Sequence, residues 1–487
     1  MEKLKKQDTL WVAIILVGML IGYCLDVNLG TGDEIWNFHN VLKYYQGYTL
    51  YTDMNLIITP LFVLLGKGIF QLLGANLFVF RIYNILIFTA LFLVIYSLLK
   101  QLLKDKKKAF LVLGILYFFL IQTIPGGANY NILAMLFYLF GVVYTLKNRG
   151  KSPFYWLVQG CIAFLIFLTK QNIGFWYVIG LCISNVVLYQ TNKKRIVECV
   201  KQLFVLGFFI LIFLFGLWCS GNLFSFIDYA VLGLQEFGSK NILGEIEQIL
   251  FASFLIITVI VVSYILQHHD KITLLVEERM NINLLLVFGI VSSSMMFPIF
   301  NSYHVRLACL LVLILLIYLL CLCFKELEIK AYVFKAIAIC LVFIAIATSI
   351  FFSMEWLKQI MKKEYPYSYK EPFFGAVVSE EIQSKIEQVN NYRKKVGKKV
   401  VIFSSEAALF NIPMGINDGT MDLPFLGNMG YHGEERMLYT IKNLENTILL
   451  ITKEKMNVQE SKKIRNYIEN HYSRIGEIGI FYIYETN

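Results

Sequence analysis

Long apolar stretches alternate with short polar ones along residues 1–353. A stretch of about 20 apolar residues crosses the hydrocarbon core of a bilayer as a helix. The stretch 56–73 is apolar too, but Pro60, Gly66 and Lys67 interrupt it, and we interpret it as a partly embedded segment. The pattern predicts eleven transmembrane helices, at 9–26, 77–99, 109–124, 130–146, 153–169, 173–190, 202–219, 248–267, 283–299, 307–324 and 332–353.

The pattern changes after residue 353. Residues 354–378 include Pro366 and Pro372, and we interpret them as a connector. The rest of the chain, 379–487, alternates amphipathic stretches with short apolar runs, which is typical of a small α/β domain. Its predicted elements are a helix at 379–397 capped by Ser379 and stopped by Gly397, strands at 399–404, 447–452 and 478–485, a helix at 457–472 in which Asn457 and Glu460 have capping-box spacing, and a long loop at 410–436.

Charge predicts how the chain crosses the membrane. The loops on the side of the N-terminus hold twenty Lys and Arg residues, against five on the other side. Basic residues concentrate in short cytoplasmic loops, so the N-terminus is predicted inside and, after eleven spans, the C-terminal domain outside. The first helix is expected to be retained, because no small-residue cleavage site follows it.

Composition agrees with an integral membrane protein, since 57% of the residues are hydrophobic and 16% are charged. The net charge of +10 comes mainly from the predicted cytoplasmic loops, so it requires no nucleic-acid partner. All nine cysteines lie in or beside apolar stretches, and the exported domain has none. These features favour a bacterial plasma membrane over a disulfide-rich secretory setting.

The first predicted external loop, 27–76, carries the acidic candidates for catalysis. Asp33 and Glu34 appear as soon as the chain becomes polar, and Asp53 follows about 20 residues later. The apolar residues that follow the pair have the spacing of a helix lying along the membrane surface. A carboxylate at its start could accept a proton from an acceptor hydroxyl. Asp33 could equally be a helix N-cap, and Asp53 a turn residue.

Two further polar sets lie at predicted external ends of spans. Lys170 interrupts two apolar stretches and is followed by Gln171 and Asn172; Tyr303, His304 and Arg306 precede the tenth span. A charge at such a position is costly unless it meets an anion or water, so Lys170, His304 and Arg306 are candidates for binding a donor phosphate. The weaker candidates are Gln171, Asn172 and Tyr303. Lys170 could also extend to the surface, and 300–306 could be an interfacial anchor.

The Gly-rich stretch 124–131 also lies at an external end and contains Asn129. It could bring backbone groups near a sugar. A tight turn between two spans explains it equally well.

These features together resemble the C-type glycosyltransferase superfamily, GT-C, and within it bacterial protein O-mannosyltransferases and aminoarabinose transferases. The resemblance rests on a first helix with its N-terminus inside, an external loop that opens on Asp33 and Glu34, the second acidic position Asp53, and a Pro-Leu pair at Pro60. This chain has Thr59 before that proline, where the relatives often carry His or a second proline, so no role is transferred to Thr59.

The resemblance implies transfer of a sugar from a polyprenyl-phosphate-linked donor to an extracytoplasmic acceptor, which can be a cell-surface glycan, a lipid or a protein. It implies inversion at the anomeric carbon, with Asp33 as base. No Gly-rich phosphate-binding loop occurs on the cytoplasmic side, which favours a lipid-linked over a nucleotide-linked donor. Asp33, Glu34 and Asp53 could hold a divalent cation, but their spacing does not require one.

Two other functions fit a multi-span chain of this kind. A flippase or transporter of lipid-linked sugars would place charges within the spans along a path, whereas nearly all external-side charges here lie at span ends. A surface polysaccharide polymerase or ligase would share the lipid-linked substrates and differ in acceptor and donor size.

Overall fold

The computed structural model describes residues 18, 29, 33–121, 129–240, 243–244, 246–269, 272–297, 299–326, 373, 378, 380–421, 428–453 and 460–486. Contacts divide the chain into two compact units. The helical unit contains the described residues of 86–213 and 242–357. The mixed unit contains those of 17–85, 214–241 and 358–487.

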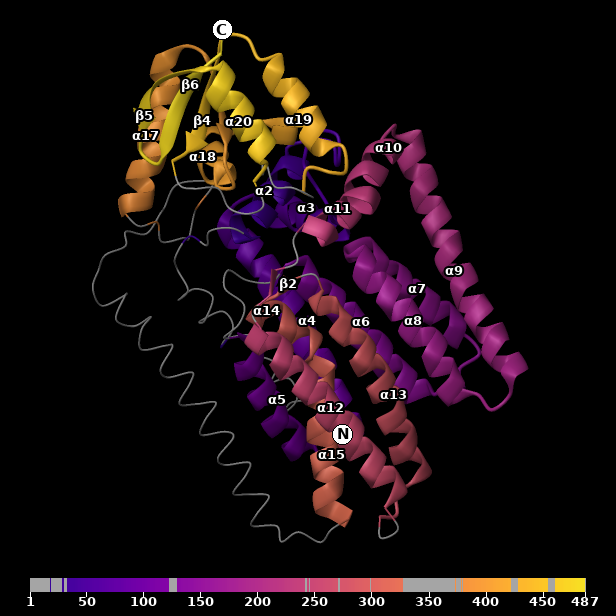
Figure 1. The fold of residues 1–487 in the computed structure, drawn as a ribbon. Helices are drawn as coiled ribbons and strands as arrows, with labels where there is room; N and C mark the ends of the chain where they lie inside the picture. The colour runs from indigo at the N-terminus through magenta and orange to yellow at the C-terminus, as the bar shows by residue number, and fades with distance from the viewer. Residues whose placement is uncertain are drawn as a thin grey trace. The chain divides into compact units, whose positions relative to one another are not determined.

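The helices of the helical unit run side by side (Figure 1). Two of them, α4 and α9, continue into the mixed unit. The strands β1 (Leu243–Gly244) and β2 (Ile299–Phe300) form a short parallel pair, which joins the segment before α12 to the segment before α14. The helices are α4 (Leu77–Leu103), α5 (Lys106–Ile121), α6 (Tyr130–Asn148), α7 (Tyr155–Thr169), α8 (Gln171–Leu188), α9 (Asn192–Cys219), α12 (Ile246–His268), α13 (Val276–Ser293), α14 (Ser302–Ala308) and α15 (Leu310–Glu326).

These helices match the predicted spans. Within the described residues, six helices are long and apolar enough to cross a membrane, namely α4, α6, α8, α9, α12 and the Val276–Met296 segment that begins with α13. Nine predicted spans fall on described residues, and each corresponds to a helix; α9 begins ten residues before its predicted start. The spans 9–26 and 332–353 and the connector 354–378 lie largely or wholly outside the described residues. The chain therefore has a helical, multi-span membrane part.

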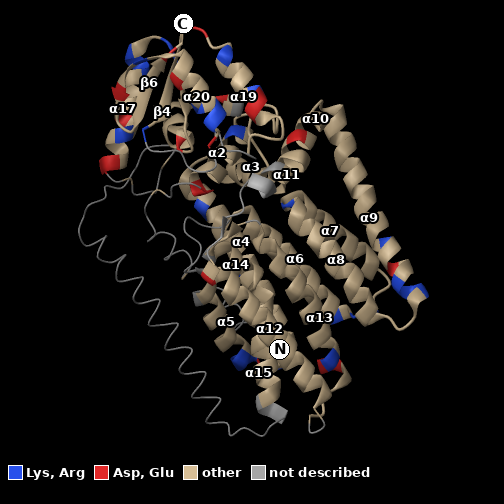
Figure 2. Ribbon diagram, in the orientation of Figure 1, with Lys and Arg blue, Asp and Glu red and all other residues tan. Residues whose placement is uncertain are grey.

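Charged residues collect at one end of the helical unit. Figure 2 shows blue and red at the beginnings of α5, α9 and α13 and mostly tan along their lengths. Lys104, from the α4–α5 connection, lies 3.4 Å from a Glu277 carboxylate oxygen, and Arg149, after α6, lies 2.6 Å from the other. The structure thus brings together loops that charge counting assigned to one side. Which side is cytoplasmic remains a prediction.

Small residues allow close helix packing inside this unit. A Cβ at Gly141 would lie 1.8 Å from the Tyr177 hydroxyl oxygen, so α6 and α8 can approach only because this residue is glycine. The Tyr177 hydroxyl donates to Gln159 Oε1 at 2.6 Å, and Gln159 Nε2 donates to Thr145 Oγ1 at 2.6 Å. Buried polar side chains therefore satisfy one another between α6, α7 and α8.

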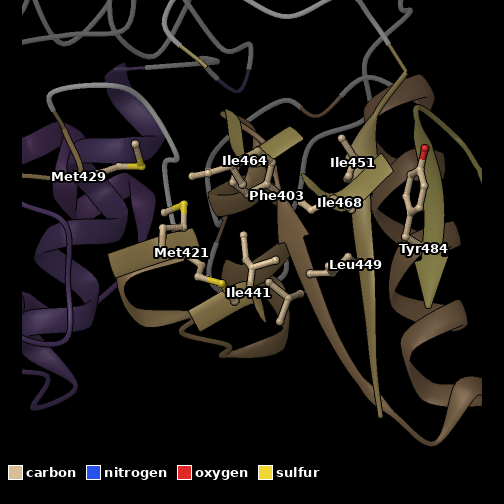
Figure 3. Packing of buried hydrophobic residues seen from close by; sticks show 11 residues of the cluster. Phe403, Met421, Met429, Ile441, Leu449, Ile451, Ile464, Ile468 and Tyr484 are labelled. Atoms are coloured by element: carbon tan, nitrogen blue, oxygen red, sulfur yellow. The ribbon is translucent and has the colours of Figure 1, made fainter. Parts of the chain in front are cut away.

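The mixed unit contains a four-stranded sheet in the order β3-β4-β6-β5. β3 and β4 are parallel, and the remaining neighbours are antiparallel. Phe403, Leu449 and Ile451 on the strands pack against Ile464 and Ile468 of α20 (Figure 3). The elements are α17 (Glu380–Val396), β3 (Lys399–Phe403), α18 (Ala407–Asn411), α19 (Gly433–Lys442), β4 (Thr447–Thr452), α20 (Lys462–His471), β5 (Ser473–Ile478) and β6 (Phe481–Glu485).

The α/β prediction is confirmed in class and corrected in detail. The predicted strand 478–485 is the end of a hairpin, because Gly479 adopts φ +50° and turns β5 back into β6. The second helix begins at Lys462 with Ser461 as its N-cap, so the cap predicted from Asn457 and Glu460 is wrong. The stretch 410–436 is a loop only in part, since α18 ends in it and α19 begins in it.

The rest of the mixed unit comes from the first loop and from residues 214–241. The predicted partly embedded segment forms α3 (Leu61–Leu73), whose thirteen residues span about 20 Å at 1.5 Å each. Residues 223–240 are helical and form α10 (Leu223–Phe226), a π-helix (Ile227–Leu232) and α11 (Gly233–Lys240). Asp33 begins a helix as predicted, α2 (Asp33–Tyr45).

α2 is buried more fully than a single apolar face predicts, because nine of its thirteen residues are buried, polar ones among them. Its location along the membrane surface stays a prediction. Phe38 of α2 lies 6.0 Å, between ring centroids, from Phe70 and 5.7 Å from Phe80. A Cβ at Gly66 would lie 2.8 Å from Val41, so α2 and α3 are in close contact. Buried aromatic packing therefore fixes α2 inside the protein.

Candidate active site

The two carboxylates that open α2 have different surroundings. Asp33 is exposed at the first residue of the helix, and its backbone carbonyl accepts a hydrogen bond from Asn37 Nδ2 at 2.8 Å. Glu34 is 3% exposed. Arg81 Nε donates to its Oε1 at 2.8 Å, and Arg81 Nη2 donates to its Oε2 at 3.0 Å. The geometry is that of a bidentate, buried ion pair, which holds the start of α2 against α4.

Asp53 is part of a tight turn. Its Oδ2 accepts a hydrogen bond from the Thr49 N–H at 2.7 Å, and its own N–H donates to the Thr49 carbonyl at 3.0 Å. Its backbone carbonyl accepts from Asn417 Nδ2 at 3.3 Å. One carboxylate oxygen therefore stabilises the loop, which agrees with the alternative that Asp53 is a turn residue.

The loop 49–58 around this turn contains one strained backbone position. Tyr51 is buried and adopts φ +67°, a region that bulky side chains rarely occupy. Its hydroxyl donates to the Ile58 carbonyl at 3.0 Å, and its ring lies 5.2 Å from that of Phe226. Such strain persists only where many contacts determine the backbone, and it is frequent near functional sites.

Two of the basic and polar candidates of the helical unit, Lys170 and Tyr303, belong to one hydrogen-bonded cluster at the start of α6. Lys170 is the single residue between α7 and α8, and its Nζ donates to Asn131 Oδ1 at 2.5 Å. The Tyr303 hydroxyl donates to Asn129 Oδ1 at 2.8 Å, and the same oxygen caps α6 by accepting from the Asn131 N–H at 2.9 Å. The structure thus connects Lys170 with Tyr303 through the start of α6.

His304 lies beside this cluster and is neutral. Its Nδ1 lies 2.8 Å from Asn301 Oδ1, which also accepts from the His304 N–H at 3.0 Å. The amide oxygen must receive a proton, so Nδ1 carries it and Nε2 is an acceptor. Burial, helped by the charge of Lys170, lowers the pKa of His304 from 6.5 to about 3. The ring therefore has no proton at Nε2 to donate to a phosphate.

The remaining basic and polar candidates are Arg306, Gln171 and Asn172. Arg306 lies in α14 with its guanidinium 5.5 Å from the centre of the Phe119 ring, a cation–π contact. Gln171 is the first residue of α8, and Asn172 Oδ1 accepts from the Ile173 N–H at 2.9 Å. Among the described residues, no group of three or more His, Cys, Asp or Glu is placed to hold a metal ion.

Several residues of these sites were missed by the sequence interpretation. Arg81 was a charge inside an apolar stretch, and that alone predicts a buried partner. Asn131 lay in the Gly-rich stretch 124–131, but no local pattern showed that it meets Lys170. Asp228 of the π-helix pairs with His432 and Arg436, and no local pattern in the sequence pointed to either partner.

Comparison with known proteins gives a result at the level of structure. No family model matches this sequence, and no curated protein matches it either. Among solved structures, ArnT from Cupriavidus metallidurans bound to undecaprenyl phosphate is similar with a TM-score of 0.57 at 10% identity, over 98% of each chain. The oligosaccharyltransferase of Archaeoglobus fulgidus, in complex with Zn and sulfate, is similar with a TM-score of 0.52 at 12% identity, over 96% of this chain and 72% of that one.

Identities this low show the fold alone. The match nevertheless spans nearly the whole chain, membrane part and C-terminal α/β part alike. The resemblance to GT-C glycosyltransferases expected from the sequence is therefore confirmed at the level of fold, and this chain has the fold of GT-C membrane glycosyltransferases.

Proposed function

We propose that this protein transfers a sugar from a polyprenyl-phosphate-linked donor to an extracytoplasmic acceptor, with inversion of the anomeric carbon. The observation that carries the proposal is the near full-length similarity to ArnT, a structure bound to undecaprenyl phosphate. We place the protein in a bacterial plasma membrane, N-terminus inside and C-terminus outside. The acceptor is a cell-envelope glycan, lipid or protein.

Asp33 is proposed as the base. It is exposed at the first residue of α2. The neighbouring carboxylate, Glu34, is buried and forms an ion pair with Arg81. A reacting group works best on a rigid element, and the ion pair one residue away fixes the end of α2. The structure therefore favours a division of roles, in which Asp33 accepts the proton and Glu34 positions the helix rather than reacting. Asp53 is proposed to shape the same loop through its turn.

Lys170 and Arg306 are proposed to stabilise the donor phosphate. Both are cations on the helical unit, and Lys170 is already oriented by Asn131. The neutral ring of His304 has no proton at Nε2 to donate to the phosphate. We propose that His304 instead helps to orient the cluster through its hydrogen bond to Asn301. Tyr303, Gln171 and Asn172 would line the same end of the helices. Preorganised cations of this kind stabilise the charge that develops when a phosphate leaves.

The reaction then proceeds in one displacement. The acceptor oxygen forms a bond to the anomeric carbon as the bond from that carbon to the phosphate oxygen breaks. The electron pair leaves with polyprenyl phosphate, whose negative charge Lys170 and Arg306 offset. Asp33 takes the acceptor proton. Attack opposite the leaving group inverts the anomeric carbon, which needs one base and no covalent intermediate, unlike retaining glycosidases.

The test is transfer by the purified protein in nanodiscs supplied with undecaprenyl-phosphate monosaccharides and an envelope extract. Asp33→Asn should reduce turnover by roughly a hundredfold or more, since general-base catalysis typically contributes about 10²–10⁴-fold. Asp105→Asn is the matched control, because Asp105 also lies at a helix start, where its Oδ1 accepts from the Lys107 N–H at 2.8 Å. Unchanged turnover in Asp33→Asn would refute the base assignment. A chelator in parallel reactions measures metal dependence.

A further inference from the structure

The π-helix Ile227–Leu232 holds a carboxylate that the proposed chemistry does not use. Asp228 is 8% exposed, and both of its oxygens accept hydrogen bonds from the C-terminal α/β part. Oδ1 lies 2.7 Å from His432 Nδ1 and 3.1 Å from the His432 backbone nitrogen. Oδ2 accepts from Arg436 Nη1 at 3.0 Å, and the Asp228 carbonyl accepts from the Tyr431 N–H at 3.0 Å.

The segment Met429–Arg436 is shaped around this carboxylate. Gly430 adopts φ +82°, and a Cβ there would lie 2.5 Å from Asp228 Oδ2. Arg436 Nη2 donates to the Met429 carbonyl at 2.7 Å, which closes the segment on itself. Met429 belongs to the hydrophobic core of the sheet (Figure 3). The contact to Asp228 is therefore continuous with the α/β core.

The other side of the same helical stretch contacts the first loop. The Tyr229 hydroxyl donates to Asn55 Oδ1 at 2.8 Å, and both residues are buried. Thr52 Oγ1 donates to Asn222 Oδ1 at 2.9 Å. Arg436, which binds Asp228, also lies 4.9 Å from the centre of the Tyr229 ring. Two adjacent residues of the π-helix thus connect the α/β part with the loop 49–58.

We propose that Asp228 is a positioning residue, which fixes the loop 49–58 through Tyr229 and so lets the C-terminal α/β part control the geometry of the first loop. A single π-helical turn inside a helix is rare and often lies at functional sites, and here it directs Asp228 and Tyr229 to two different partners. The consequence for catalysis rests on the proposed function, because this loop joins α2, which carries Asp33, to α3. The coupling itself does not require any activity.

Hydrogen exchange of the full-length protein in nanodiscs tests the coupling. Tyr229→Phe should speed exchange of the amides in 48–58 by about fivefold, as expected for the loss of one neutral hydrogen bond. Asp228→Asn should speed exchange by roughly tenfold in both 48–58 and 428–436, since its bonds are charge-assisted. In the double variant, the effect of Tyr229→Phe on 48–58 should disappear. The strand amides of 447–452 should be unchanged in all three.

The control variants are Tyr439→Phe and Glu435→Gln, which likewise remove a tyrosine hydroxyl and a carboxylate charge, but at exposed positions of α19. The coupling is wrong if Asp228→Asn loosens 428–436 but leaves 48–58 protected, or if the effects of the two variants on 48–58 simply add. In transfer assays, Asp228→Asn should lower kcat several-fold with an unchanged donor KM. A rise in donor KM at constant kcat would contradict the positioning role.

Discussion

The Glu34–Arg81 pair allows a quantitative prediction. Arg81→Met removes one partner of an ion pair whose side chains are 7% and 1% exposed, and takes away the guanidinium that donates to both oxygens of the buried Glu34 carboxylate. Breaking such a pair costs about 3–5 kcal/mol, because the remaining charge keeps its desolvation penalty. Solvent screening is small at these exposures, so we expect the full loss. Replacing both residues in Glu34→Met with Arg81→Met should restore stability to within about 1–2 kcal/mol of the wild type.

Unfolding in mixed micelles, followed by tryptophan fluorescence, measures the three free energies. Trp36 lies two residues beyond Glu34 in α2 and reports locally. Lys67→Met is the matched control, since Lys67 Nζ contacts the Tyr44 ring at 4.2 Å and its loss should cost only about 0.5–1 kcal/mol. A double variant as unstable as Arg81→Met alone would refute the reasoning, because the penalty would then not arise from an unpaired buried charge.

Three further predictions concern the two cations Lys170 and Arg306, the neutral His304 and Gly430, which has a positive φ. Lys170→Ala and Arg306→Ala should each lower donor kcat/KM by roughly ten- to hundredfold while leaving the acceptor KM unchanged; equal effects on both substrates would indicate a structural role. His304 has a lower pKa in the folded than in the unfolded protein, so the unfolded chain binds the proton first. Its stabilising contribution should be complete above pH 6.5 and lost between about 6.5 and 3, and a melting series of His304→Gln should show a shallower acid loss. Gly430→Ala should destabilise the protein by about 1–3 kcal/mol in the same unfolding assay, and by more than Gly415→Ala, which has φ +62° but no atom near the new Cβ.

The sequence predicted the helices well and their partners poorly. Whether a stretch such as α6 or α12 is a helix depends on local hydropathy, because the bilayer itself imposes the length and the internal hydrogen bonding. Counting basic residues also assigned the loops that contain Lys104 and Arg149 to the same side of the membrane, and in the structure both residues pair with Glu277. The strands predicted at 399–404 and 447–452 are β3 and β4, and continuous apolar runs predicted both.

Pairs between distant residues have no local signal. Glu34 and Arg81 are 47 residues apart, and Asp228 and Arg436 are 208 apart, so no periodicity connects them. The burial of polar residues in α2 was missed for this reason, because their partners, such as Arg81 for Glu34, lie in other segments. The hairpin of β5 and β6 was missed because the turn at Gly479 lies within an apolar run.

The central claim is that the protein joins a sugar to an acceptor, rather than moving a lipid-linked sugar across the membrane. The most direct measurement uses proteoliposomes loaded with a labelled undecaprenyl-phosphate monosaccharide, with acceptor extract outside. We predict that labelled acceptor and free undecaprenyl phosphate form in equal amounts, and that both are lost in Asp33→Asn. Transbilayer movement of intact donor, with no release of undecaprenyl phosphate, would contradict the account.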